Sequence, residues 1–275
     1  MPSIDQLSIN LATVRKRWNL VEAVEGCAQA GIRAVAPWRD QVAAVGLAES
    51  ARVIKDHGMR VTGLCRGGMF PAADAAERQT RIDDNRRAIE EAWTLGAECL
   101  VLVVGGLPPG SKDLAGARRM VEDGIGAVLA DARAAKIPLA IEPLHPMYAG
   151  DRAVVNTTGQ ALDICDRLGN DGLGVALDVY HVWWDPEIEA QIRRAGAKRL
   201  LACHVCDWLV PTADLLEDRG MMGDGVIDIR GLRTMVEAQG YDGCHEVEIF
   251  SRETWWQREP AEVLRVCVER HAASC

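Results

Sequence analysis

Four short segments decide the fold of this 275-residue chain: PLAIEP (138–143), GVALDVY (174–180), LLACHVC (200–206) and CHEVEIF (244–250). Each is an apolar run of strand length that turns polar near its end. Four upstream segments have the same apolar, β-branched character: LSINLAT (7–13), IRAVAPW (32–38), RVTGLC (60–65) and CLVLVVG (99–105). Stretches of helical periodicity separate them, and two of these are expected to end at Gly58 and Gly240, because glycine adopts the left-handed cap conformation most easily. This alternation predicts parallel strands joined by crossover helices.

The number of units favours a closed barrel over an open sheet. Eight units in this chain length leave roughly 34 residues for each, which suits the strand, helix and two connections of a (β/α)8 TIM barrel. An open doubly wound sheet would carry a glycine-rich dinucleotide turn after its first strand, and NLATVRKRW (10–18) contains no glycine. GGLPPGSK (105–112) and RGMMGDG (219–225) are predicted as loops at the C-terminal rim, not as linkers. We therefore predict one α/β domain, a TIM barrel spanning residues 1–275.

The composition favours chemistry on a small molecule. The formal net charge is -9, which opposes a large nucleic-acid surface. Neither an N-terminal signal sequence nor a run of roughly 20 apolar residues for a membrane helix is apparent. We expect a cytoplasmic protein with no nucleic-acid and no membrane partner. The nine cysteines lack the framework of a secreted scaffold and are expected to be buried thiols.

Polar residues at the ends of four successive predicted strands form the candidate site. In a TIM barrel these positions face the open mouth where catalysis occurs. Because side chains alternate along a strand, each of these residues points to the same side as the residue two positions earlier. That earlier residue is alanine in three of the four strands, and such small side chains suit the inside of a barrel. A lone carboxylate at a strand end is more often a cap or an ion-pair partner, but four successive strands favour a metal site. The candidate ligands are Glu142, Asp178, His204 and Glu248.

Three carboxylates and one imidazole make an oxygen-rich donor set. We therefore expect one divalent metal ion as cofactor, with Mn2+ preferred and Mg2+, Co2+ or Zn2+ also compatible. Glu246 lies one layer deeper than Glu248 by parity, which suits a buried structural partner.

The ordered motifs of the C-terminal half resemble a known superfamily. They are IEP (141–143), LDVYH (177–181), HVCD (204–207), EDRGMMGDGVID (217–228) and GYDGCHEVEIF (240–250). Together they resemble the xylose-isomerase-like sugar isomerase/epimerase superfamily, and within it inosose isomerases of inositol catabolism and ketose 3-epimerases. The resemblance covers nearly the whole chain as alternating units, and its specific part is these motifs.

The resemblance implies roles for individual residues. Glu142 and Glu248 would act as the catalytic acid/base pair as well as binding the metal with the other two ligands. His181 is similar to the family's substrate-side or metal-side histidine, and Arg219 to the arginine that holds a substrate oxygen. Asp207 is similar to a carboxylate behind the ligands, which orients a ligand or a rim residue.

The implied reaction is isomerisation or epimerisation of a small sugar or polyol ketone, an inosose or a ketose, by proton transfer through an enediolate that the metal stabilises. Loss of a β-hydroxyl at the same site would instead make the enzyme a dehydratase or lyase. Substrate placement decides between these outcomes, and homo-oligomers are common among the relatives. The rim residues that would place the substrate are Trp38, Arg39, Arg66, His145, Trp183, Trp184 and Trp208.

Three other functions fit fewer of the residues. An abasic-site endonuclease of the same superfamily uses several metals, more histidines than the six here, and a surface that accepts DNA. A redox or zinc role for Cys203-x-x-Cys206 is disfavoured, because the two cysteines alternate to opposite faces of a strand. A non-catalytic sugar-binding barrel would be favoured by loss of an acid/base residue, and both glutamates are present.

Overall fold

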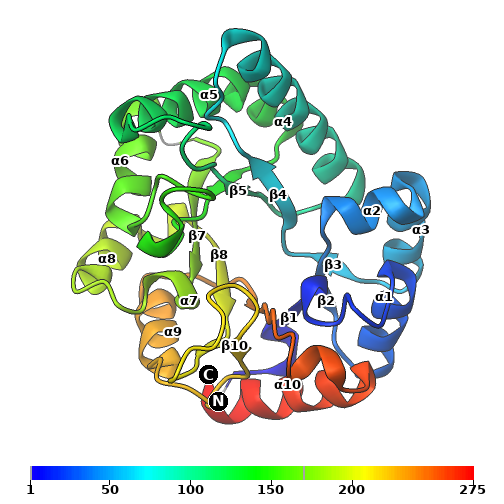
Figure 1. Cartoon of the computed structure of the whole chain (residues 1–275). Coiled ribbons are helices and arrows are strands. Elements are labelled where there is room, and N and C mark those ends of the chain that lie inside the picture. The colour runs from blue at the N-terminus through cyan, green and yellow to red at the C-terminus, as the bar shows by residue number, and fades with distance from the viewer. Residues whose placement is uncertain (1, 170) are drawn as a thin grey trace.

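A ring of parallel strands surrounded by helices forms the molecule in a computed structural model that describes residues 2–169 and 171–275 (Figure 1). The parallel strands form one nine-stranded sheet in the order β3-β2-β1-β11-β8-β7-β6-β5-β4. Its strands are β1 (Leu7–Asn10), β2 (Ala34–Ala36), β3 (Arg60–Val61), β4 (Leu64–Gly68), β5 (Leu100–Val103), β6 (Leu139–Ile141), β7 (Leu173–Asp178), β8 (Leu200–Val205) and β11 (His245–Val247). The predicted TIM barrel is therefore confirmed.

The barrel closes through its third predicted strand, which the structure divides into β3 and β4. β3 pairs with β2, and β4 pairs with β5. Between the two halves, the Thr62 amide donates to the Val35 carbonyl at 3.1 Å and the Leu64 amide to the Cys99 carbonyl at 3.0 Å. Because two amides separated by a single residue reach the neighbours on either side, β3 and β4 together serve as one strand of an eight-unit barrel.

The helices cover the outside of the sheet, as Figure 1 shows. They are α1 (Leu20–Gln29), α2 (Arg39–Val45), α3 (Leu47–Asp56), α4 (Ala75–Leu95), α5 (Leu114–Ala135), α6 (Thr158–Leu168), α7 (Val179–Val182), α8 (Ile188–Arg199), α9 (Ile229–Ala238) and α10 (Pro260–Ser274). None of the helices in the described residues is both long enough and apolar enough to pass through a membrane.

Local sequence explains where several helices begin and end. α1 begins with a capping box, in which the Asn19 side chain accepts from the Glu22 amide at 3.1 Å and the Glu22 carboxylate accepts from the Asn19 amide at 2.9 Å. α3 and α9 end just before Gly58 and Gly240, whose φ angles are +62° and +89°. Both glycines occupy the left-handed conformation that the sequence predicted for them.

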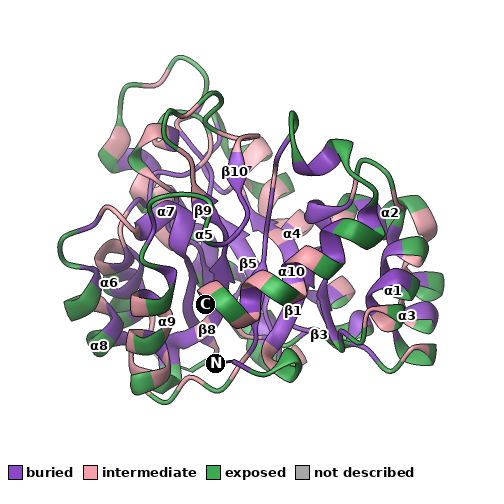
Figure 2. Ribbon diagram, turned by 90° about the horizontal axis from the view of Figure 1, so that it is seen from below, coloured by how far each residue is buried: buried purple, intermediate pink, exposed green. Residues whose placement is uncertain are grey.

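Two apolar layers hold the barrel together. The larger lies between the sheet and the helices, and buried residues follow the strands while exposed ones follow the outer helix faces (Figure 2). The smaller fills the barrel interior, where side chains are short; its members are Cys65, Cys99, Val101, Ala140, Ala176 and Ala202. Three of these are the alanines two positions before the candidate ligands, so the alternation predicted from the sequence places the ligands one layer above a packed floor.

Candidate metal and substrate site

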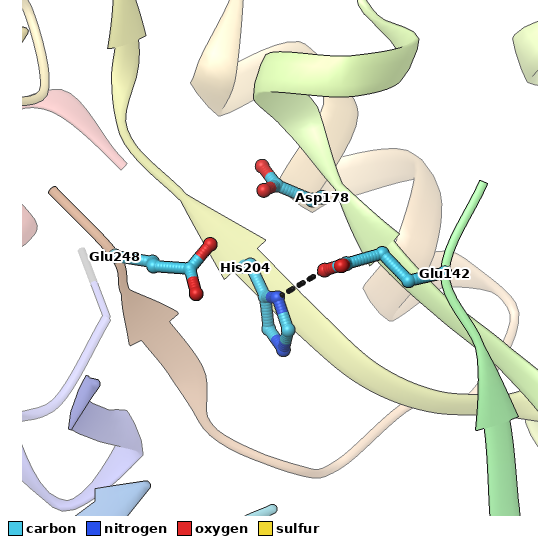
Figure 3. Close-up of side chains that lie close together, drawn as sticks. All are labelled: Glu142, Asp178, His204 and Glu248. Atoms are coloured by element: carbon cyan, nitrogen blue, oxygen red, sulfur yellow. Dashed lines mark hydrogen bonds and ion pairs between the residues drawn. The ribbon is translucent and has the colours of Figure 1, made fainter. Parts of the chain in front are cut away.

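The four candidate ligands come together at the mouth of the barrel (Figure 3). Glu142 directly follows β6 and Glu248 directly follows β11, while Asp178 ends β7 and His204 lies in β8. One donor atom from each residue lies within 4.8 Å of the others, and no side chain of the four is more than slightly exposed. The structure thus brings all four side chains together, and their role as metal ligands stays a prediction.

The ring of His204 is contacted on both nitrogens. Its Nδ1 lies 3.0 Å from Glu142 Oε1, on the side of the other candidate ligands (Figure 3). Its Nε2 lies 3.5 Å from Glu246 Oε1 and has no hydrogen-bond partner in residues 2–169 and 171–275. Burial alone lowers the pKa of His204, but the carboxylates of Glu246 and Glu142 raise it well above the usual value. A metal would bind the neutral ring, and Nδ1 is the nitrogen that faces the other candidate ligands.

Glu246 is a buried partner of the site and not a member of the ligand cluster. Its Oε1 accepts from Asn10 Nδ2 at 2.8 Å, and its Oε2 accepts from Thr62 Oγ1 at 2.7 Å. Asn10 Nδ2 also donates to Glu248 Oε1 at 3.0 Å, and Trp38 Nε1 donates to Asn10 Oδ1 at 2.7 Å. Asn10 consequently links the deeper carboxylate to the candidate ligand above it.

Arg219 lies against two of the candidate ligands. Its Nη1 donates to Asp178 Oδ2 at 2.9 Å and to Glu248 Oε2 at 2.8 Å. Burial works against its charge, yet these two carboxylates raise the pKa of Arg219 well above its usual value. Burial lowers the pKa of His181 to about 3, so this histidine is neutral, and its Nε2, 3.2 Å from Arg219 Nη2, accepts from the guanidinium. Arg219 and His181 thus face the cluster, where the resemblance placed them.

The charges and donors of the cluster fit a divalent ion. With His204 neutral and all three carboxylates ionised, as metal binding requires, the cluster and the guanidinium of Arg219 together carry two negative charges. Burial raises the pKa of Glu248 to about 8; Arg219 opposes this shift and the negative charge of Glu142 adds to it. One nitrogen and several oxygen donors around a doubly negative centre suit Mn2+, Zn2+ or a similar ion.

Asp207 lies behind the site and organises a loop. It belongs to β9 (Asp207–Trp208), which pairs in antiparallel fashion with β10 (Arg219–Gly220). Its carboxylate accepts from the amides of Trp208, Gly223, Gly225 and Ile227 at 2.8–3.0 Å. Among the residues that the structure describes, the hydrogen bonds of Asp207 all go to these amides, so its carboxylate fixes the loop that carries Arg219.

A second rim loop covers the mouth. The hydroxyls of Tyr148 and Tyr180 both donate to the carbonyl of Leu215, the latter at 3.1 Å. Beneath this loop the cavity measures about 40 Å³, enough for only a few water molecules. A sugar would enter only if rim side chains or this loop moved. The lining residues are Trp38, Arg66, Val103, Glu142, Leu144, Tyr148, Arg152, His181, Leu216, Arg219, Glu248 and Phe250.

The rim residues named from the sequence lie in different places. Trp38 and Arg66 line the cavity, whereas Arg39 turns away and is bound by Asp84 and Glu91. The remaining four contact one another ring to ring: His145, Trp183, Trp184 and Trp208.

Three residues of the site were missed in the sequence. Asn10 ends β1, and the strand-end rule that found the candidate ligands would also have found it. Tyr148 and Arg152 lie in the loop after β6, where no local pattern marks them.

The two cysteines of Cys203-x-x-Cys206 are both buried. Both pack in the large apolar layer, and Cys206 Sγ also lies 3.8 Å from Arg219 Nη1. Burial raises the pKa of both thiols, and all nine cysteines are free and buried. These are inert thiols and not a redox pair.

Comparison with known proteins identifies the family. Residues 24–267 match the family described as the xylose isomerase-like TIM barrel. The chain belongs to this family. The resemblance inferred from the sequence motifs is thereby confirmed.

Two curated relatives are inosose isomerases. The one from Bacillus velezensis is 23% identical over 275 residues, covering 96% of this chain and 95% of the relative. The one from Halalkalibacterium halodurans is 26% identical over 130 residues, so this chain spans 46% of that relative's length.

Solved structures of the same fold include one much more similar protein. Protein SMc04130 from Sinorhizobium meliloti 1021 is 62% identical, covers 99% of both chains and superimposes with a TM-score of 0.98. The IOLI protein, whose structure contains a bound zinc atom, is 21% identical, covers 98% of this chain and 97% of its own, and has a TM-score of 0.84. At that identity the likeness to the IOLI protein establishes the fold alone.

Proposed function

We propose that this TIM barrel is a divalent-metal-dependent isomerase or epimerase of a small ketose or inosose. The observation that carries the proposal is the buried cluster of Glu142, Asp178, His204 and Glu248 above an apolar floor. Membership of the xylose isomerase-like family and the two inosose isomerase relatives support the same class of reaction.

The four clustered residues would hold the ion, with Mn2+ as our preferred metal. When bound, such an ion polarises a carbonyl and makes the neighbouring C–H acidic. His204 would contribute Nδ1, because that nitrogen faces the cluster while Nε2 faces Glu246.

Two carboxylates are placed to move the proton. Glu142 and Glu248 lie on opposite sides of His204 in Figure 3 and come from strands separated in the sheet by β7 and β8. A substrate bound between them would present its reacting carbon to one carboxylate on each side. We assign proton removal to one glutamate and proton return to the other, which permits inversion at a single carbon or transfer to its neighbour.

Arg219 and the neutral His181 would orient the substrate. The guanidinium is a fixed positive charge beside the cluster, and it is suited to a developing negative charge on a substrate oxygen. The loop over Tyr148 and Tyr180 would keep bulk water from the exchanging proton.

Deuterium uptake tests the proposal. The manganese-loaded protein is incubated in D2O with an inosose, D-fructose or D-psicose in separate reactions. The mass of the recovered sugar is then measured by mass spectrometry. We expect deuterium to be incorporated and the rate to fall at least about 100-fold in Glu142→Gln and Glu248→Gln. The exposed Glu253→Gln is the matched control and should match the wild type. Loss of water from the sugar would indicate the dehydratase instead, and no change with any ketone would contradict the proposal.

A further inference from the structure

Two arginines line the proposed active site without a carboxylate partner. Arg66 comes from β4, and Arg152 comes from the loop after β6, which is held in place because the Gly105 amide donates to the Arg152 carbonyl at 2.9 Å. Both line the same cavity as Glu142 and Glu248. In the part of the chain that the structure describes, neither guanidinium makes a hydrogen bond or an ion pair; that of Arg152 lies 5.6 Å from the ring centre of Tyr148.

The neighbouring arginines show that this is unusual for the molecule. Arg66 also lines an adjoining cavity of about 780 Å³, together with four other arginines. Each of those four is bound to a carboxylate: Arg15 to Asp40, Arg39 to Asp84 and Glu91, Arg81 to Glu77, and Arg87 to Asp84. The acids that line this cavity are therefore paired with other arginines, and none of them forms an ion pair with Arg66.

Arg66 and Arg152 also repel one another. Burial lowers the pKa of Arg66, and the positive charge of Arg152 lowers it further. Two guanidinium groups in one cavity, partly removed from water and without an acid paired to either, form a site that an anion would stabilise. Arg219 does not compete for such an anion, because Asp178 and Glu248 already occupy its Nη1.

We propose that the substrate of this enzyme is an anionic ketose or keto-polyol, whose carboxylate or phosphate ester is bound by Arg66 and Arg152. This inference rests on the proposed function, because it assigns the far end of the substrate whose carbonyl end lies at Glu142 and Glu248. The planar forks of both arginines match the oxygen pairs of a carboxylate or a phosphate. Room for a longer substrate exists on this side, since Trp38 and Arg66 line both the small cavity and the 780 Å³ cavity beside it.

Three ligands that differ only at carbon 6 test the inference. D-fructose carries a hydroxyl there, D-fructuronate a carboxylate and D-fructose 6-phosphate a phosphate ester. Calorimetric titration of the manganese-loaded protein should show at least about 10-fold tighter binding of one anionic ligand than of fructose. The preferred ligand identifies the carboxylate or the phosphate as the anion. In Arg66→Gln and Arg152→Gln the preference should fall below about 3-fold, while Arg66→Lys should retain part of it.

Two controls make the result decisive. The exposed Arg119→Gln, whose side chain lines neither cavity, should keep the full preference. Inorganic phosphate, added to metal-free protein, should raise the melting temperature of the wild type but not that of Arg66→Gln, and this readout needs no correct sugar. Either of two results would overturn the inference. One is an anion preference that is unchanged in both arginine variants. The other is equal binding of the three ligands together with no stabilisation of the wild type by phosphate. If the inference fails, deuterium exchange into uncharged ketoses would still support the proposed function. If instead the anion preference depends on the arginines but no ketose exchanges deuterium, only the proposed function is overturned.

Discussion

His204 depends on residues that are not themselves candidate ligands. The Oε1 atom of Glu246 lies 3.5 Å from its Nε2, and Asn10 and Thr62 fix the position of that carboxylate from two sides. A carboxylate behind a ligating histidine selects the tautomer that offers the other nitrogen to the metal. The orientation of the one nitrogen donor is thus set one layer below the site.

Glu246→Gln should weaken metal binding without unfolding the protein. Glutamine has the same shape but no charge, so it stabilises the Nε2–H tautomer of His204 less well. We expect the dissociation constant for Mn2+ to rise about 10-fold to 100-fold, measured by competition with a fluorescent chelator. Glu253→Gln should leave it unchanged. Unaltered affinity in Glu246→Gln would show that Glu246 acts only in packing.

At the residue scale, the sequence located the candidate ligands but not all of their surroundings. Strand alternation was enough to predict that Glu142 and Glu248 point into the barrel mouth, because side chains along a strand alternate between the inside and the outside of the barrel. Arg152 could not be found this way. Its position depends on long-range backbone bonds such as Gly105 to Arg152, and no local pattern encodes those.

At the scale of elements, one carboxylate determines the shape of the loop carrying Arg219. Asp207 accepts four backbone amides, two on each oxygen, and a hydrogen bond to a charged group contributes about 1.5–3 kcal/mol. The adjacent pairing of β9 with β10 then positions Arg219 beside Asp178. The sequence indicated an orienting role for Asp207, and the structure shows that its contacts are to the loop.

Asp207→Asn should loosen this loop. An asparagine turns an NH2 group toward two amides that now donate to the carboxylate, so those amides lose their acceptor. We expect the free energy of unfolding to fall by about 3 kcal/mol in urea titrations, and hydrogen exchange to rise across residues 219–228. Asp224→Asn on the same loop removes only an exposed ion pair with Arg270 and should cost less than about 1 kcal/mol. Equal losses in the two variants would contradict this account.

A buried histidine pair joins β11 to α10 and should make stability depend on pH. His245 Nδ1 lies 3.1 Å from His271 Nε2, with Glu237 and Arg233 beside them. Burial lowers the pKa of each to about 4, below the value of about 6.5 in an unfolded chain. The unfolded chain therefore binds more protons between these values, and stability is complete above pH 6.5 and falls as the pH drops toward 4.

The size of this effect is roughly 1.4 kcal/mol for each pKa unit of each group. Urea titrations at pH 7 and pH 4.5 should thus show a larger loss for the wild type than for His271→Gln, which keeps a hydrogen-bonding side chain without a titrating ring. The same loss in both proteins would mean that other groups cause the acid sensitivity.

For element boundaries, the sequence predicted eight strands and the structure divides one of them. The predicted strand at 60–65 is split around Thr62 and Gly63, where a Cβ on Gly63 would lie 3.3 Å from Val101. The division reflects a change of partner from β2 to β5 along this segment, which a local sequence pattern does not encode.

At the scale of the whole molecule, the barrel was predictable because its signal repeats. Each strand and helix unit adds to the same period, and errors at single boundaries do not change the count. What the sequence could not give is how the rim closes, since the loop at Leu215 is held by tyrosines from two separate segments. The sequence named Arg66 as a rim residue, but only the structure shows that it shares a cavity with Arg152.

Metal stoichiometry tests the central claim most directly. Protein incubated with Mn2+ and desalted is analysed by inductively coupled plasma mass spectrometry, for the wild type, Asp178→Asn, Glu248→Gln and the exposed control Glu253→Gln. Melting curves confirm that each variant is folded. We predict about one ion per chain in the wild type and the control, and a small fraction of that in the two site variants. No bound ion in the wild type, or the same occupancy in all four proteins, would contradict the account.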